Sequence, residues 1–454
     1  YPEALLTFEK NYPDAKVLLM EENFRSDARI VLAADRFIQK NTLRHEKHMK
    51  AARKPASDIR EISLRSRKAQ YTYLAKLAEG CTSQTAILYR DNECILPLVD
   101  LLERNGIPYQ MRNAELSFFS HRTILDIINI IKLAQNPMDT EAFLQIYYKI
   151  GTYLRKQDAI RIARISEEKR IPVLDVAAED PDLNGHVLGS VRSMWTHLQN
   201  LLQDSGERAL YRIMQYMGYQ EYLNRSGLSD SKLEILRILG SRADSPMELA
   251  ERLEQLKVLI REKEPDRKCP LILSTIHASK GLEYDSVYLI DVADGILPES
   301  IPQNLHQASA EELKAYEEER RLFYVGVTRA KDHLTLFTTN RPSTFCSEFL
   351  GKSSVTEEGR KNLMPVESRI SRTFKQARPY AAVAGIRQTK ASEELYFRLK
   401  EELGTGVIVE HKKYGEGVVT QLDDRLVHIM FQDDTLRMMD LKILANAGLL
   451  KVKK

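Results

Sequence analysis

Two groups of apolar strand-like runs, separated by a long stretch of purely helical pattern, constrain the fold more than any other feature of the sequence. The runs that fit strands lie at 17–20, 59–64, 85–89, 107–111, 271–275, 287–290 and 334–338. Within each group they alternate with segments whose apolar residues recur at helical spacing, which is typical of a parallel α/β layer. We therefore predict an α/β protein with one parallel-sheet domain that an all-helical insertion interrupts.

The predicted boundaries follow the changes in pattern. Residues 1–121 form the first half of the sheet domain, 122–268 the helical insertion, and 269–345 the second half of the sheet domain. Residues 346–404 are polar and basic with few periodic apolar positions, so we expect a linker. Residues 405–454 contain short alternating strands with Gly and Asp turns, which predict a compact β-barrel.

Composition and cysteine spacing exclude several classes of protein. The 454 residues are 43% hydrophobic and 29% charged, and the formal net charge is +3, as in ordinary globular proteins. The four cysteines are far apart and form no Cys-x-x-Cys pair, so neither a zinc site nor a disulfide framework is expected, and a reducing cytoplasm fits. The sequence has no apolar run of about 18 residues, so we expect no membrane span.

One arginine stands where a helix meets a strand. Residues 317–337 read EEERRLFYVGVTRAKDHLTLF, in which Leu322, Val325 and Arg329 share a helical face before a strand-like run begins. At this junction the cation of Arg329 can point into a cleft, although a lone arginine at such a place is ordinarily a surface residue on a helix. A second stretch favours the functional interpretation of Arg329. This stretch, residues 274–298, reads STIHASKGLEYDSVYLIDVADGILP.

Together the two stretches resemble the last two ATP-and-DNA motifs of the UvrD/Rep/PcrA-like superfamily 1A DNA helicases. The resemblance implies that residues 1–345 are the RecA-like domain 2A with its inserted helical domain 2B, and that residues 1–15 are a remnant of domain 1A. Residues 409–419 (VEHKKYGEGVV) resemble the Tudor-like end of the same helicases, a protein-interaction module that in some members binds RNA polymerase.

The phosphate-binding half of a nucleotide site is not found in this sequence. A phosphate loop requires Gly-x-x-x-x-Gly-Lys-[Ser/Thr], and the run at 351–353 fails because Cys346 stands where the first glycine is needed. Asp291 follows a strand, but Val292 replaces the second acid of a magnesium-binding pair, so we interpret Asp291 as structural. The chain also starts without Met. We expect a fragment that does not hydrolyse ATP alone, with the phosphate loop and Mg ligands in a missing N-terminal part.

The resemblance implies a nucleotide-binding role for five residues. Arg25 and Arg329 match arginines that reach the γ-phosphate, and Arg329 is the candidate arginine finger. Phe24 stands where the family has a tyrosine that stacks on adenine, Glu283 matches a residue that meets the ribose, and Gly281 allows close backbone approach. Taken alone, Phe24 fits a core aromatic and Glu283 a surface charge. We expect the two arginines to converge on one pocket.

Five further residues are implied to contact single-stranded DNA. Thr275 and His277 match positions near the strand's backbone, and Arg90 and Asn92 match a strand-contacting Ile-Leu-Tyr-Arg-x-Asn motif. Phe345 is similar in position to a phenylalanine that stacks on a base, although a core phenylalanine under the last strand fits nearly as well.

The sequence therefore predicts the C-terminal part of an ATP-dependent 3′–5′ DNA helicase that uses ATP with Mg and binds single-stranded and duplex DNA. RNA polymerase or a repair factor is the expected partner of the Tudor-like tail, and no membrane contact is expected. The alternative is an ATPase-less adaptor of helicase fold that binds DNA or RNA polymerase. A helicase–nuclease subunit gains no support, because no metal-binding carboxylate cluster follows residue 345.

Overall fold

The protein is described by a computed structural model, which shows two compact units, 1–355 and 356–454. The described residues are 8–352, except 13, 15, 17, 19, 43, 45–46, 113–116, 228–230, 265, 267, 303, 306 and 342, and then 399, 403 and 407–452, except 413, 423–425, 432–435 and 447–448. Most of the predicted linker, 346–404, therefore lies outside the described residues.

A six-stranded sheet forms the centre of the first unit, and all of its strands are parallel. Its order is β3-β8-β7-β4-β6-β5, so strands from both ends of the unit interleave. The strands are β3 (Arg60–Leu64), β4 (Thr85–Tyr89), β5 (Gln110–Met111), β6 (Leu271–Thr275), β7 (Tyr284–Leu289) and β8 (Ala330–Thr339). The predicted α/β class and the discontinuous parallel sheet are confirmed.

Alternate residues of the central strands pack against different helices. Ile87 and Tyr89 of β4 join one hydrophobic cluster with α4 (Arg67–Glu79) and α5 (Leu96–Arg104). Ala86 and Leu88 join a second cluster with α3 (Ala28–Ile38), α16 (Ala310–Val327) and α17 (Thr344–Leu350). Because strand side chains alternate between faces, a strand covered on both sides must be apolar at successive positions, as these strands are.

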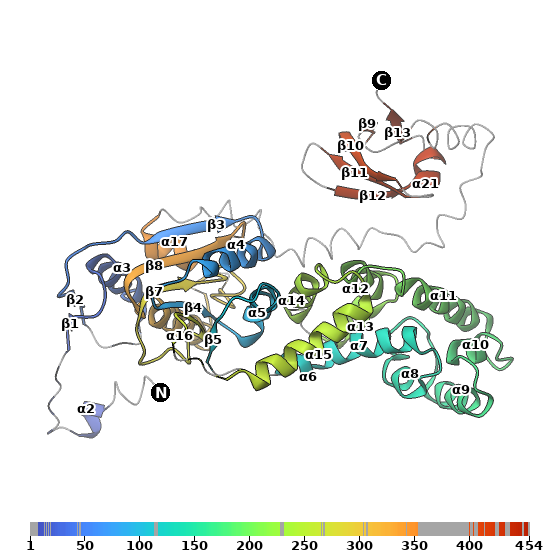
Figure 1. The fold of residues 1–454 in the computed structure, drawn as a ribbon, viewed down its shortest axis with the longest axis horizontal. Helices are drawn as coiled ribbons and strands as arrows, with labels where there is room; N and C mark the ends of the chain where they lie inside the picture. Colours follow the sequence, from blue (N-terminus) through green and yellow to red (C-terminus); the bar gives the residue numbers. More distant parts are fainter. Residues whose placement is uncertain are drawn as a thin grey trace. The chain divides into compact units, whose positions relative to one another are not determined.

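The stretch between β5 and β6 contains helices joined by loops, with no strand among its described residues. After the short α6 (Ser117–Ser120) come α7 (Arg122–Gln135), α8 (Thr140–Ile146), α9 (Lys156–Lys169), α10 (Val173–Ala178), α11 (Gly185–Leu201), α12 (Gly206–Gln215), α13 (Tyr219–Ser226), α14 (Ser231–Gly240) and α15 (Pro246–Glu262). The ribbon in Figure 1 shows α15 beside α7, and the same hydrophobic cluster includes Ile127 and Leu253 from these helices. The predicted helical insertion is confirmed.

The start of the sheet domain differs from the prediction. Leu18 and Met20 were expected in a strand, yet both lie outside any strand and are 86% and 79% exposed. The other two residues of that run lie outside the described part of the chain. The first strand is instead β1 (Glu22–Asn23), which pairs in parallel with β2 (Lys50–Ala51) away from the main sheet. An apolar run of four residues without alternation was too short to identify a strand.

The second unit is a curled antiparallel sheet in the order β12-β11-β10-β9-β13. Its elements are β9 (Ile408–His411), β10 (Gly415–Leu422), β11 (Leu426–Phe431), β12 (Leu436–Asp440), α21 (Leu441–Asn446) and β13 (Leu450–Val452). Val409, Val419 and Ile429 form its core. The predicted strands are present, but β12 and β13 lie at opposite ends of the order, so a closed barrel is not confirmed.

Candidate functional site

Three of the predicted nucleotide-binding residues come together at the amino-terminal edge of the sheet. Tyr284, which begins β7, pairs with Ala330, which begins β8, and the Tyr284 N–H donates to the carbonyl of Arg329 at 2.9 Å. Glu283 and Arg329 are the residues immediately before these paired positions. The register of two parallel strands therefore places this carboxylate and this guanidinium at the same edge.

Arg25 joins them because the segment before α3 is bonded to the start of β8. The Ser26 hydroxyl donates to the Ala330 carbonyl at 2.7 Å, and the Asp27 N–H donates to the Lys331 carbonyl at 2.7 Å. The Arg25 Nε then donates to Glu283 Oε2 at 2.7 Å. The structure thus brings Arg25, Glu283 and Arg329 together, although Arg25 and Arg329 are far apart in the sequence.

Arg329 is anchored by its own helix and loop. Its Nε donates to the Val325 carbonyl (2.9 Å), Nη1 to the Leu282 carbonyl (3.0 Å) and Nη2 to the Thr328 hydroxyl (3.2 Å). Each of the two Nη atoms carries a second N–H, because a guanidinium has five donors. The side chain is therefore oriented at the end of α16 with donors beyond those used in these bonds.

The electrostatics of this edge favour an anion. Burial lowers the pKa of Arg329, and the nearby charge of Arg25 lowers it further. The hydrogen bond from Arg25 lowers the pKa of Glu283 despite its desolvation, and Lys331 also approaches that carboxylate at 3.5 Å. Arg25 and Lys331 pair with Glu283, and Lys331 also reaches Asp285 at 3.4 Å. A polyanion such as a triphosphate relieves the repulsion between Arg25 and Arg329.

Phe24 and Gly281 lie at the same edge for different reasons. Phe24 is 70% exposed and precedes Arg25, so its ring is accessible rather than part of the core. Gly281 has φ +86°, a conformation that favours glycine, and a Cβ built there meets no atom within 4 Å. The backbone conformation, rather than a close approach within the chain, explains the glycine.

The predicted DNA-binding residues lie at the opposite edge. Tyr89 at the end of β4 pairs with Thr275 at the end of β6, so Arg90 and Asn92 follow one strand and His277 follows its neighbour. His277 is exposed, and Thr275 is buried with its Oγ1 accepting the Ala278 N–H at 3.1 Å. Because carboxyl ends of parallel strands share an edge, four of the five predicted residues come together there.

Asn92 begins the 3-10 turn η1 (Asn92–Ile95) and carries an unsatisfied polar atom. Its Oδ1 is buried and has no hydrogen-bond partner among the described residues. Buried amide oxygens are normally hydrogen-bonded, so this atom is available to a donor that approaches the edge.

Arg90 is surrounded by carboxylates, which sequence reasoning missed. Its Nη1 contacts Asp91 at 2.7 Å, and its Nη2 contacts Glu319 at 2.8 Å and Glu299 at 3.0 Å. Burial works against its charge, but the bonds to Glu319 and the three negative charges raise its pKa. Glu299 and Glu319 come from segments remote in sequence, so no local pattern marked them.

Phe345 does not fit the predicted base-stacking role. It is fully buried in α17, with ring centroids 5.3 Å from Phe37 and from Tyr316 and 5.6 Å from Phe323. The Arg320 guanidinium lies 5.1 Å from its ring centroid. Neither face is open to a base, and the alternative of a core phenylalanine describes its position.

Asp291 is structural, as the sequence predicted. It is fully buried just after β7 at φ +56°, and Arg67 donates to both of its oxygens, with Gln70 Nε2 donating to Oδ1 at 2.8 Å. Gly351 adopts φ +68° as the C-cap of α17, and Lys352 pairs with Glu61. Residues 351 and 352 thus follow the helix α17 rather than a strand.

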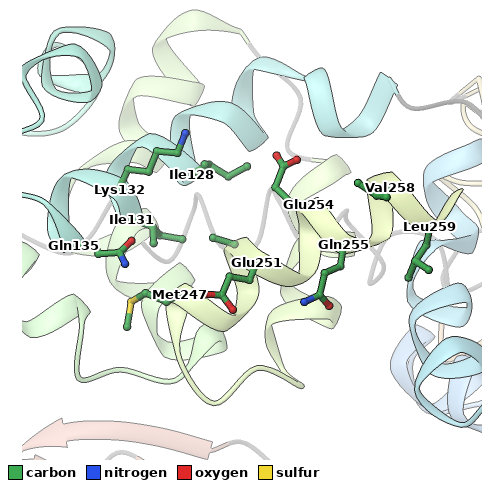
Figure 2. A pocket seen from close by; sticks show the side chains of 11 residues that line it. Ile128, Ile131, Lys132, Gln135, Met247, Glu251, Glu254, Gln255, Val258 and Leu259 are labelled. Atoms are coloured by element: carbon green, nitrogen blue, oxygen red, sulfur yellow. The ribbon is translucent and has the colours of Figure 1, made fainter. Parts of the chain in front are cut away.

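A groove in the insertion holds none of the predicted site residues. Figure 2 shows its lining side chains, which come from α7 and α15. They are Ile128, Ile131, Lys132, Gln135, Met247, Ala250, Glu251, Glu254, Gln255, Val258 and Leu259. Within the described part of the chain, no group of three or more His, Cys, Asp or Glu side chains is placed to hold a metal ion, and no helix has the length and apolar character needed to cross a membrane.

Comparison with known proteins confirms the resemblance. A family model for the UvrD-like helicase C-terminal domain matches residues 18–187 and 236–341, more than half of the chain. YjcD of Bacillus subtilis is 29% identical over 352 residues, covering 74% of this chain and 45% of YjcD. The ATP-dependent DNA helicase PcrA of Staphylococcus epidermidis is 25% identical over 456 residues, covering 93% of this chain and 60% of PcrA.

The ATP-dependent DNA helicase Rep of Escherichia coli is 28% identical over 379 residues, covering 76% of this chain and 54% of Rep. This chain thus spans about half the length of the curated relatives it matches. The match includes both halves of the discontinuous sheet and both edges described above. The chain belongs to the family of UvrD-like helicase C-terminal domains.

Proposed function

We propose that this chain is the C-terminal part of an ATP-dependent DNA helicase that moves 3′ to 5′ along single-stranded DNA and unwinds duplex. Its amino-terminal sheet edge faces the nucleotide, and another motor domain of the intact protein supplies the phosphate loop and the Mg ligands. The observation that carries the proposal is the meeting of Arg25, Glu283 and Arg329 at one edge.

The residues at this edge fit ATP. Arg25 and Arg329 contact the γ-phosphate and stabilise the charge that develops during its transfer, with Arg329 as the arginine finger. Glu283 meets the ribose, and the exposed ring of Phe24 stacks on adenine. ATP with Mg supplies the phosphoryl group and the free energy of hydrolysis. The residues of this chain bind ATP, orient it and neutralise the charge of its γ-phosphate.

Single-stranded DNA lies along the other edge, beside Asn92, Thr275 and His277. The segment 276–283 starts at the end of β6 and finishes at the start of β7, so it runs from the DNA edge to the nucleotide edge. A shift of one end therefore moves the other, and this connection couples strand stepping to the nucleotide cycle. Arg90 contacts the DNA once Asp91, Glu299 and Glu319 release its guanidinium.

The second unit serves as a Tudor-like protein-binding module in this proposal. Ile408 and Val418 are directly opposite each other on β9 and β10 and are 49% and 41% exposed. Glu410 and Glu416 form the next pair on the same face. An apolar pair beside acidic side chains suits a partner with apolar and basic residues, such as a surface of RNA polymerase or of a repair factor.

The test of the ATP-binding proposal is Arg329→Ala in the intact protein, with ATP hydrolysis measured in the presence of single-stranded DNA. Arginine fingers supply about 10³-fold or more in kcat, so we expect a loss of that size. Arg29→Ala is the matched control, because Arg29 lies nearby on α3 and pairs with exposed Asp58. Hydrolysis by Arg329→Ala within about threefold of wild type would reject the finger role. No hydrolysis by the intact wild-type protein would favour the ATPase-less adaptor.

A further inference from the structure

Residues 50–57 pass beside the loop that carries Arg25 and are fastened to it at two places. At one end, β2 pairs with β1, and the Ala52 N–H donates to the Asn23 carbonyl at 3.0 Å. At the other end, the Asp27 carboxylate accepts the N–H groups of Ala56 at 2.6 Å and Ser57 at 3.1 Å. The backbone in the middle of this segment is therefore held against the Arg25 loop.

Arg53 lies between these two attachments and joins the chain segments that bear the two arginines. Its Nη1 donates to the carbonyls of Arg25 (2.6 Å) and Lys331 (3.2 Å), and its Nη2 donates to Asp332 Oδ1 (2.5 Å). Lys331 and Asp332 follow Arg329 by two and three residues. One planar group thus links the peptide of Arg25 to the strand that starts beside Arg329.

We propose that Arg53 is a positioning residue that holds Arg25 and Arg329 at the separation needed to engage one phosphoryl group. This inference rests on the proposed function. Arg53 itself does not contact the nucleotide; it acts through the backbone of Arg25. A displacement of about 1 Å in a catalytic group costs up to 10²-fold in rate, so a link made to the Arg25 peptide itself has a direct consequence for kcat.

The chemistry of this link requires a guanidinium. Its fork presents several N–H groups in one plane, which is how Arg53 reaches two carbonyls and one carboxylate together. A lysine keeps the positive charge beside Asp332 but directs all its donors from one nitrogen. Arg53→Lys therefore separates the geometric role from the charge.

Arg53 is not needed to attach α3 to the sheet. The bonds from Ser26 to the Ala330 carbonyl and from Asp27 to the Lys331 carbonyl make that attachment independently. The Arg53 side chain is 38% exposed and lies outside the hydrophobic clusters. We therefore expect its variants to fold, with the loss confined to the geometry of the Arg25 loop.

The experiment compares Arg53→Ala, Arg53→Lys, Arg25→Ala and the double variant Arg25→Ala/Arg53→Ala in the intact protein, with Arg29→Ala as control. Steady-state ATP hydrolysis is measured with saturating oligothymidine. We expect kcat to fall about tenfold in both Arg53 variants, with KM for ATP within about twofold of wild type. Because Arg53 acts through Arg25, the double variant should be no slower than Arg25→Ala alone.

Two results would overturn the inference: an Arg53→Ala kcat within about threefold of wild type, or a double variant whose losses multiply. If Arg25→Ala itself keeps full activity, the proposed function fails, whatever Arg53 does. If Arg25→Ala is inactive and Arg53→Ala is not, only the positioning role fails. Should Arg53→Ala not fold, Asp332→Asn removes one partner of the link and must lower kcat without raising KM for the inference to stand.

Discussion

Arg67 and Asp291 form a buried two-point ion pair in which Nε donates to Oδ1 at 2.9 Å and Nη2 to Oδ2 at 2.6 Å. Burial acts against the charge of Arg67, but the Asp291 carboxylate raises the arginine's pKa well above its ordinary value. The pair connects the start of α4 to the end of β7. It locks the carboxyl edge of the sheet, beside the strand ends that carry the proposed DNA-binding residues.

Breaking this pair should destabilise the sheet domain. Asp291→Asn keeps a side chain that tolerates φ +56° but removes the charge, so buried Arg67 loses its two-point partner and keeps only Glu234, at 3.3 Å, as a counterion. We expect a loss of about 3–5 kcal/mol in the free energy of unfolding, measured by denaturant titration. Asp182→Asn, at an exposed carboxylate in the insertion, is the control and should change stability little. Equal stability of the two variants would contradict the assigned role of Asp291.

Removing the negative charge beside Arg90 should strengthen DNA binding. Glu319→Gln keeps the shape of the side chain but lowers the repulsion of phosphate and weakens the hold on Arg90. We expect binding of labelled oligothymidine to tighten by about threefold at low salt, measured by fluorescence anisotropy. Glu318→Gln makes the same charge change on the same helix, where the carboxylate pairs with Arg321. If both variants bind alike, Glu319 does not restrain Arg90.

Two phenylalanines predicted to stack should respond differently to truncation. Phe345→Ala removes a fully buried ring and should cost about 3–5 kcal/mol of stability, with no change in DNA affinity per folded molecule. Phe24→Ala removes an exposed ring, so we expect a stability change within about 0.5 kcal/mol and a raised KM for ATP. Thermal unfolding and steady-state kinetics separate the two. A DNA-binding defect in folded Phe345→Ala would restore the stacking role.

Asp27 should make stability depend on acid pH. Burial raises the pKa of Asp27, but hydrogen bonds from the backbone N–H groups of Ala56, Arg29 and Ser57 lower it by more. The net pKa therefore lies below the ordinary value of 3.8. Because the folded pKa is depressed, the contribution is present above 3.8 and is lost as pH falls through the lower folded value. Asp27→Asn should therefore reduce stability at neutral pH and flatten the acid limb of the unfolding profile. An unchanged acid limb would contradict this assignment.

Much of the sheet could be predicted because its strands are covered on both faces. Thr85–Tyr89 and Leu271–Thr275 were predicted with the bounds that the structure shows. A strand with helices on both sides must be apolar at consecutive positions, and such runs stand out against helical periodicity. The run at 17–20 has the same appearance, yet Leu18 and Met20 are exposed outside any strand, because no local signal distinguishes a covered run from an exposed one.

The elements, the helical insertion and the motif residues that identify the family could be predicted from the sequence, because spacing within one helix or strand is a local property. The surroundings of each side chain depend instead on long-range packing. Arg25 reaches Glu283, carboxylates from two other segments hold Arg90, and Phe345 is sealed in the core. These contacts join residues separated by most of the sheet domain, and the pairing of parallel strands across the insertion creates them.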